Sequence, residues 1–144
     1  MKIKFTVLGE PQGKGRPIFG GKTKAGTPIT RTPDKTVFYE NLIITEYRRQ
    51  VGSAKFEDNT NLDMRITAYY TIPASASKKK QKQMENGEIR PTKKPDMDNI
   101  VKVVADSLNS IAYRDDAQIV DCQIRKFYSR QPRIEVTILT AASR

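Results

Sequence analysis

The segment from Asp96 to Asp121 constrains the fold most, because it must form a helix and still keep a dense set of carboxylates accessible. It contains six of the nine aspartates, no glutamate, and only two basic residues, Lys102 and Arg114. Its formal charge is −4 (two basic less six acidic residues), so the rest of the chain carries +14 to reach the total of +10. A basic body with one acidic segment suggests that the body binds a polyanion and the segment a divalent cation, the layout of a metal-dependent nuclease.

Residues 98–109 have the spacing of an amphipathic helix, because at roughly 100° per residue polar and apolar side chains fall on opposite sides. The polar side comprises Asp98, Asn99, Lys102, Asp106 and Asn109, and the apolar side comprises Ile100, Val101, Val104, Ala105 and Leu108. Capping by Asp96 or Asp98 is the ordinary role for one of them, but a cap does not need both. Lys102 lies one turn from Asp98 and from Asp106, so a surface ion-pair ladder is its alternative role.

The apolar periodicity also predicts the remaining elements. The predicted strands are residues 2–8, 63–72, 118–128 and 133–139, and the predicted helices are 34–50, with Asp34 as its N-cap, and a short one within 75–88. The last two strands are expected to form a hairpin, with Val120, Cys122 and Ile124 facing inward. One aspartate pair, Asp96 and Asp98, lies at the start of the helix, and the other, Asp115-Asp116, precedes a strand. The two pairs can therefore meet at one end of the sheet and helix.

Residues 9–33 are predicted to form a flexible basic loop, because they hold six of the eight glycines and four of the eight prolines. A phosphate-binding P-loop is excluded, since the glycine required five residues before Gly21 is replaced by Arg16. Two interpretations remain open, a solvated loop or a cationic arm that closes on phosphates. Two interpretations also remain for the lysine-rich helix within 75–88, which could be a solubilising surface or a direct DNA contact.

Composition excludes several classes of chemistry. The chain has no histidine and one cysteine, Cys122, so neither an intrachain disulfide, a cysteine-rich zinc site nor a Ser-His or Cys-His pair is possible. Acid–base work must therefore fall to Asp, Glu, Lys, Tyr or water on a metal. A length of 144 residues predicts one domain, 1–144, and the lack of a signal peptide or long apolar run predicts a cytoplasmic protein.

The acidic motif resembles that of a known family. Lys94-Pro-Asp-x-Asp-Asn99, Lys102, Asp106-x-Leu108 and Asp115-Asp116-Ala-Gln-Ile119 are similar to the signature of the RusA family of Holliday-junction resolvases. Gly15-Arg16-Pro17, Thr32-Pro33 and Tyr39-Glu40 resemble the amino-terminal part of Gram-positive and phage members, including prophage-borne ones. The resemblance implies an α+β fold with a small mixed β-sheet and two to three helices, forming a homodimer that nicks four-way DNA junctions in recombination and repair with Mg²⁺ or Mn²⁺.

The resemblance also assigns roles to residues. It implies metal-binding catalytic carboxylates at Asp96, Asp98 and Asp116, a further ligand at Asp115, and a catalytic lysine at Lys102. Asn99, Asp106 and Gln118 are expected to support these groups, with Asp106 alternatively an ion-pair partner of Lys102. The cations expected to bind DNA are Lys14, Arg16, Lys22, Lys24, Arg31, Lys78, Lys79, Lys80, Lys93 and Lys94.

Two alternatives to junction resolution remain open. A branched-DNA binding protein that does not cut would account for the basic body, but it would leave the acidic cluster without a role. A nuclease that also accepts flaps or forks would account for both. No base-reading motif is visible, so no sequence preference at the cut is predicted. The expected dimer interface includes the apolar residues Phe38, Leu42 and Tyr47, where these are not part of the core.

Overall fold

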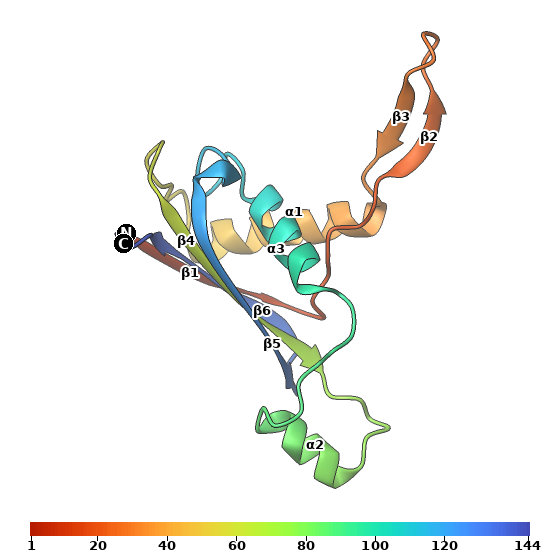
Figure 1. Ribbon diagram of the computed structural model, residues 1–144, viewed down its shortest axis with the longest axis vertical. Coiled ribbons are helices and arrows are strands. Elements are labelled where there is room, and N and C mark those ends of the chain that lie inside the picture. Colours follow the sequence, from red (N-terminus) through yellow and green to blue (C-terminus); the bar gives the residue numbers. More distant parts are fainter.

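The computed structural model describes all residues, 1–144, and confirms an α+β fold with a mixed sheet (Figure 1). Its elements are β1 (Lys2–Leu8), β2 (Ile18–Lys22), β3 (Pro28–Arg31), α1 (Asp34–Gln50), β4 (Leu62–Thr71), α2 (Lys78–Glu85), α3 (Met97–Ser107), a 3₁₀ helix η1 (Asp116–Gln118), β5 (Ile119–Ser129) and β6 (Arg133–Thr140). All predicted helices and strands are present, with small shifts at their ends. None of the helices is both long and apolar enough to span a bilayer.

The main sheet has the strand order β1-β6-β4-β5. Strand β6 is antiparallel to both of its neighbours, whereas β4 and β5 are parallel and are joined by a crossover that contains α2 and α3. Helices α1 and α3 lie on one face of this sheet (Figure 1). The core between them consists of alternate apolar residues of β1, β4 and β6 together with the inner faces of the two helices.

The predicted β5–β6 hairpin is wrong, because β4 lies between these two strands. Burial gives the physical reason. Ile134, Val136 and Ile138 of β6 are fully buried, which suits an interior strand, while Asp121 and Gln123 of β5 are exposed, which suits an edge. The short connection after Ser129 therefore passes the end of β4 instead of closing a local hairpin.

The predicted facing of β5 is wrong at its start. Val120 is 56% exposed, and Ile119 packs against the core instead. The cause is an irregularity in the β4–β5 register, where Leu62 pairs with Ile119 but Asp63 pairs with Asp121. The extra residue on β5 acts as a bulge and reverses which side chains point toward the core. The regular alternation of the sequence does not predict this reversal.

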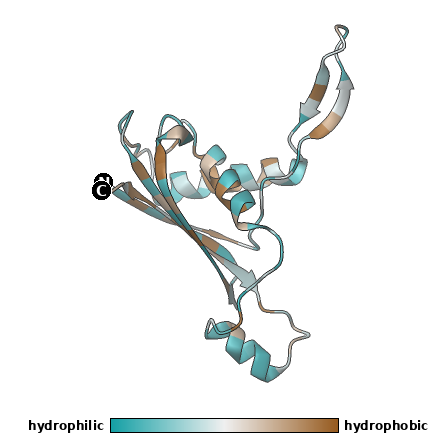
Figure 2. Cartoon of the chain, in the orientation of Figure 1, coloured by the Kyte–Doolittle hydropathy of each residue, from teal (hydrophilic) through white to brown (hydrophobic).

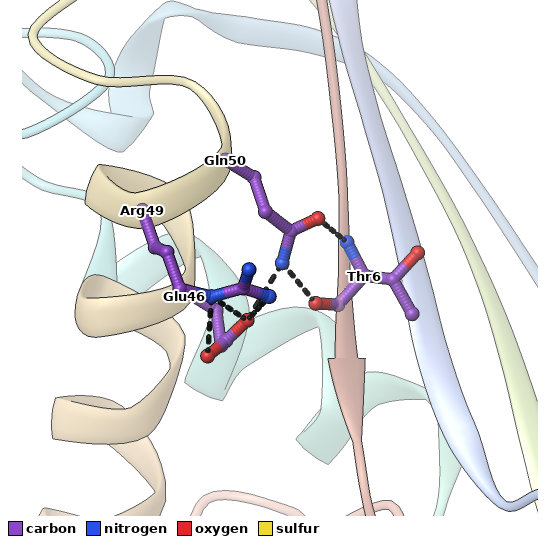
Figure 3. A network of polar contacts seen from close by, with 4 residues as sticks. All are labelled: Thr6, Glu46, Arg49 and Gln50. Carbon is purple, nitrogen blue, oxygen red and sulfur yellow. Dashed lines mark hydrogen bonds and ion pairs between the residues drawn. The ribbon is translucent and has the colours of Figure 1, made fainter.

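Helix α1 begins after Pro33, so the prediction that Asp34 is its N-cap is wrong by one residue, and no side chain caps this end. Its far end is attached to the sheet by Gln50. The amide of Gln50 accepts from Thr6 N at 2.9 Å and donates to Thr6 O at 2.6 Å, while Glu46 holds Arg49 and Gln50 together (Figure 3). This contact fixes the helix along β1.

Tyr47 is fully buried, and its hydroxyl donates to Ala54 O at 2.5 Å. It therefore belongs to the core and is not available for a dimer interface. Phe38, by contrast, is 76% exposed on the same helix. Of the apolar residues expected to pair two copies, Phe38 and the half-buried Leu42 remain accessible.

Residues 9–33 are not a loop throughout. Strands β2 and β3 form an antiparallel hairpin that projects from the body beside the start of α1 (Figure 1). Helix α2 lies at the opposite end of the molecule, where Ser77 Oγ accepts from Lys80 N at 3.2 Å and so caps it. The two lysine-rich parts of the chain therefore flank the region that carries α3.

Candidate active site

The 10–16 segment crosses α1 and α3 at close range. Lys14 N donates to Asn99 O at 3.0 Å, and Gly15 N donates to Thr36 Oγ1 at 3.0 Å. A Cβ atom at Gly13 would lie 2.8 Å from Asn99 Cβ, so only glycine permits this approach. The segment thereby places Arg16 beside the beginning of α3.

The side chain of Lys14 joins two helices. Its Nζ lies 3.3 Å from Glu40 Oε2 on α1 and 3.4 Å from Asp106 Oδ2 on α3, and the lysine side chain is 21% exposed. An ammonium group held by two carboxylates is not free for a phosphate, so the structure places Lys14 within the scaffold of the site rather than on a DNA-binding surface.

Asp106 does not pair with Lys102. No carboxylate lies within ion-pair distance of the Lys102 ammonium, which is exposed on the outer face of α3, and the predicted ladder with Asp98 and Asp106 is not formed. The surface ion-pair role for Lys102 therefore finds no support. Its charge remains available to a group outside the chain.

Asp96 and Asp98 lie at the amino end of α3. Asp96 is in the N-cap position with an extended backbone, but its carboxylate makes no capping hydrogen bond, and Asp98 follows in the first turn. Both side chains are exposed. Neither carboxylate forms a hydrogen bond or an ion pair within the chain, so both are free to accept an external cation.

A basic pocket of about 710 Å³ opens beside Asp96. Besides the ion-paired Lys14, its cationic lining residues are Arg16, Lys35, Lys93 and Lys94, and Asn99 lines it as well. Three of these cations are among those predicted to bind DNA, whereas Lys35 was missed because nothing in the spacing of α1 distinguishes it from a solvated lysine. The pocket brings cations that suit a phosphodiester next to carboxylates that suit a metal ion.

The strands beneath hold the loop that carries Asp96. Tyr70 of β4 donates from its hydroxyl to Pro95 O at 2.5 Å, and Lys126 of β5 donates from Nζ to Lys93 O at 2.7 Å. Burial, and then the charge of Asp96, raises the pKa of Tyr70, so its hydroxyl stays protonated. Burial lowers the pKa of Lys126, and the charge of Asp96 opposes this shift. Neither residue was predicted, because these contacts link parts of the chain 25 or more residues apart.

The second group of carboxylates lies at the other end of α3. Asp116 N donates to Asn109 Oδ1 at 2.8 Å, which fixes Asp116 near Asp106. Burial, a hydrogen bond to the Asp106 carboxylate and the charge of Asp115 raise the pKa of Asp116 above its ordinary value. A bound cation would offset the charge repulsion among these neighbouring carboxylates, so this donor set fits a hard divalent ion.

Gln118 fixes the backbone of this acidic turn. Its Oε1 accepts from Arg114 N and Asp115 N at 3.1 and 3.2 Å, and its Nε2 donates to Glu57 O and Thr60 O at 3.2 and 3.1 Å. The side chain thus ties the turn before η1 to the connection between α1 and β4. It supports the position of the neighbouring carboxylates.

The structure does not bring the two acidic pairs together, and no three carboxylates converge on one point. Ten residues separate Asp96 from Asp106, which corresponds to roughly 15 Å along a helix axis. The expectation that both pairs meet at one end of helix and sheet is therefore wrong. The short turn from Asn109 to Tyr113 keeps Asp116 beside the carboxyl end of α3.

The remaining predicted DNA contacts are dispersed. Lys22 and Lys24 lie on the projecting hairpin, and Arg31 at its base pairs with Asp34 at 3.0 Å. Lys78, Lys79 and Lys80 form the first turn of α2, far from the hairpin (Figure 1). These groups extend the basic surface on both sides of the central pocket.

Comparisons with known proteins agree with the motif. The chain matches the family model described as Endodeoxyribonuclease RusA over residues 9–139. It is 39% identical over 136 residues to the uncharacterized protein YqaN of Bacillus subtilis (strain 168), covering 94% of each chain. It is 29% identical over 117 residues to the crossover junction endodeoxyribonuclease rusA of Lactococcus phage r1t, covering 76% of this chain and 82% of that one. The acidic helix, the basic pocket and these matches together identify the chain as a member of the RusA family of endodeoxyribonucleases.

Proposed function

We propose that this nuclease resolves four-way DNA junctions by paired nicks that depend on Mg²⁺, with Mn²⁺ as a substitute. The observation that carries the proposal is the free carboxylate of Asp96 at the edge of a pocket lined by four unpaired cations. The relative from phage r1t bears the name of a crossover junction enzyme, which supports the choice of substrate. Recombination and repair are the processes in which such junctions arise.

Asp96 and Asp98 would hold one cation at the amino end of α3, and Asp116 with Asp106 or Asp115 would hold a second cation at its carboxyl end. When bound, the cation shields the charge of the phosphate and activates water. Arg16 and the pocket lysines would orient the phosphodiester, since an arginine fork and ammonium groups both bind phosphate oxygens.

Lys102 would act between the two acidic sets. Its unpaired ammonium lies on the outer face of α3, one turn from Asp98 and one turn from Asp106. A positive charge in this position opposes the negative charge that develops on the phosphate and leaving oxygen. Two contacts would support the segments around Lys102. The carbonyl of Asn99 accepts from Lys14 N, and the side chain of Gln118 accepts from Asp115 N.

Each chain offers one such site, so two copies related by a twofold axis would make the two opposed nicks. The accessible Phe38 and Leu42 on α1 are our candidates for that contact. Sedimentation at micromolar concentration tests the dimer. A monomer that still makes paired nicks would contradict it.

Aspartate-to-asparagine variants test the site, because each removes one charge at nearly constant shape. Asp96→Asn, Asp98→Asn and Asp116→Asn should lose cleavage of a synthetic four-way junction in Mg²⁺, while binding in EDTA is kept or strengthened. Asp121→Asn is the matched control, since Asp121 is exposed on β5 outside both acidic sets. The proposal fails if the wild-type chain cuts no junction with Mg²⁺ or Mn²⁺. Flap, fork and linear substrates in the same assay define its breadth.

A further inference from the structure

The hairpin of β2 and β3 has no other element to support it. The two strands pair with each other, and the hairpin projects away from the sheet and helices (Figure 1). An isolated two-stranded hairpin is at best marginally stable in water. We therefore expect a binding partner to cover it when the protein is at work.

Apolar side chains are exposed on both faces of this hairpin. Phe19 is 60% exposed, and Ile18 and Ile29 are 39% and 43% exposed. Phe19 pairs with Thr30, and Ile18 with Arg31, so Phe19 lies on one face and the two isoleucines on the other. Figure 2 shows these apolar stretches on an arm that is otherwise polar. A ribbon that is apolar on both sides suits insertion between two apolar surfaces.

Its charge limits what those surfaces can belong to. Residues 11–33 contain five basic residues and no acidic one. Lys22 and Lys24 of the hairpin form no ion pair within the chain, so they call for a polyanionic partner. A nucleic acid provides phosphates for the lysines and flat base faces for the apolar groups.

We propose that the hairpin inserts at the branch point of branched DNA, with Phe19 stacked on an exposed base and Lys22 and Lys24 on the flanking phosphates. The proposal rests on the junction function proposed above. Along a duplex arm each base face is covered by its neighbours, whereas opening a stack costs least where pairing is already interrupted. Phe19 is then a residue that distinguishes branched from linear DNA.

The local backbone suits this role. A bulge interrupts the β2–β3 register between Phe19 and Lys22, and Gly21 within it has φ +108°, a conformation that glycine adopts without strain. Bulges change the direction of adjacent side chains and increase the local twist. Here the bulge separates the aromatic ring from the lysines that follow it.

Binding in EDTA tests the proposal without any cleavage step. Fluorescence anisotropy would compare a four-way junction with a linear duplex of the same sequence. Phe19→Ala should weaken junction binding by roughly 5- to 150-fold, the range for loss of one aromatic–base stack, and leave duplex binding nearly unchanged. Phe19→Trp should keep the preference, and Phe19→Leu, which keeps apolar bulk without an aromatic face, should lose it. Thr30→Ala, at the position paired with Phe19, is the control for hairpin folding.

Photocrosslinking gives a direct readout on the unaltered chain. With 5-iododeoxyuridine at the branch point, the adduct should map to Phe19, and the same base placed within an arm should not crosslink there. An equal loss of junction and duplex affinity in Phe19→Ala, or a Phe19 adduct from arm positions, would overturn the proposal and indicate a ribbon in the major groove. An enzyme that cuts junctions with Mg²⁺ independently of Phe19 would refute this inference and leave the proposed function intact. Junction binding that depends on Phe19, in a protein that cuts no junction, would support this inference and refute the proposed function.

Discussion

Replacing Lys93 by glutamine should weaken DNA binding and change its salt dependence by an amount that the pocket predicts. Four cations that form no ion pair within the chain line the pocket beside Asp96, in addition to the paired Lys14. If each neutralises one phosphate, binding to duplex arms should fall with a log–log slope of about −3.6, or about 150-fold between roughly 50 and 200 mM salt. The Lys93→Gln variant should show a slope near −2.7 and a loss of about 40-fold over the same range. If Lys22 and Lys24 of the hairpin also engage, the wild-type loss rises to about 10³-fold.

Anisotropy titrations in EDTA at four salt concentrations measure both slopes without cleavage. Lys4→Gln is the matched control, because Lys4 lies on the sheet face that the helices leave uncovered and should not change the slope. Arg16→Gln should behave as Lys93→Gln does. A wild-type slope weaker than about −2, or an unchanged slope in Lys93→Gln and Arg16→Gln, would refute the assignment of the pocket to phosphate binding.

Three further predictions follow from the geometry of the site. Lys102→Met should reduce single-turnover cleavage of pre-bound junction by about 10²-fold or more with little change in affinity, and Lys102→Arg should restore part of the rate; a near-wild-type rate in Lys102→Met would remove this lysine from catalysis. Tyr70→Phe should lower the free energy of unfolding in urea by about 1 kcal/mol through loss of the bond to Pro95 O, and should slow cleavage at constant affinity; an unchanged rate would restrict Tyr70 to packing. The pKa of Asp116 is raised on folding, so its ionisation destabilises the folded state as pH rises through that pKa. In EDTA, Asp116→Asn should therefore melt higher than wild type at neutral pH and show no gain below the ordinary value of 3.8; equal melting temperatures at neutral pH would contradict the shift.

Local periodicity predicted the elements well because each buries a regular stripe. The inner residues of α3, such as Ile100 and Val104, are fully buried, and Lys102 is exposed as the spacing indicated. The pairing of strands was not predictable in the same way. The order of β5 and β6 depends on which strand can pair with a neighbour along both of its edges. The side of the sheet that Ile119 and Val120 face depends on one extra residue of β5 in its pairing with β4.

The sequence predicted which residues belong to the candidate site, but not how they are arranged in space. The motif singled out Asp96 and Asp116, but their separation along α3 follows from the short turn after the helix and not from their spacing in sequence. Lys14 was expected to meet DNA as one of several loop cations. Its ion pairs with Glu40 and Asp106 are long-range contacts that no local pattern records.

The place of β6 in the sheet has a consequence for how the chain is made. This strand, Arg133–Thr140, is the last of the four strands of the main sheet to be synthesised, and it alone hydrogen-bonds to both β1 and β4. Until it emerges from the ribosome, the first strand has no partner and β4 presents an open edge, which favours association with other chains. A premature stop before Arg133 should therefore yield an aggregation-prone product instead of a smaller working nuclease, and DNA-cutting activity should appear only when translation of the last strand is complete.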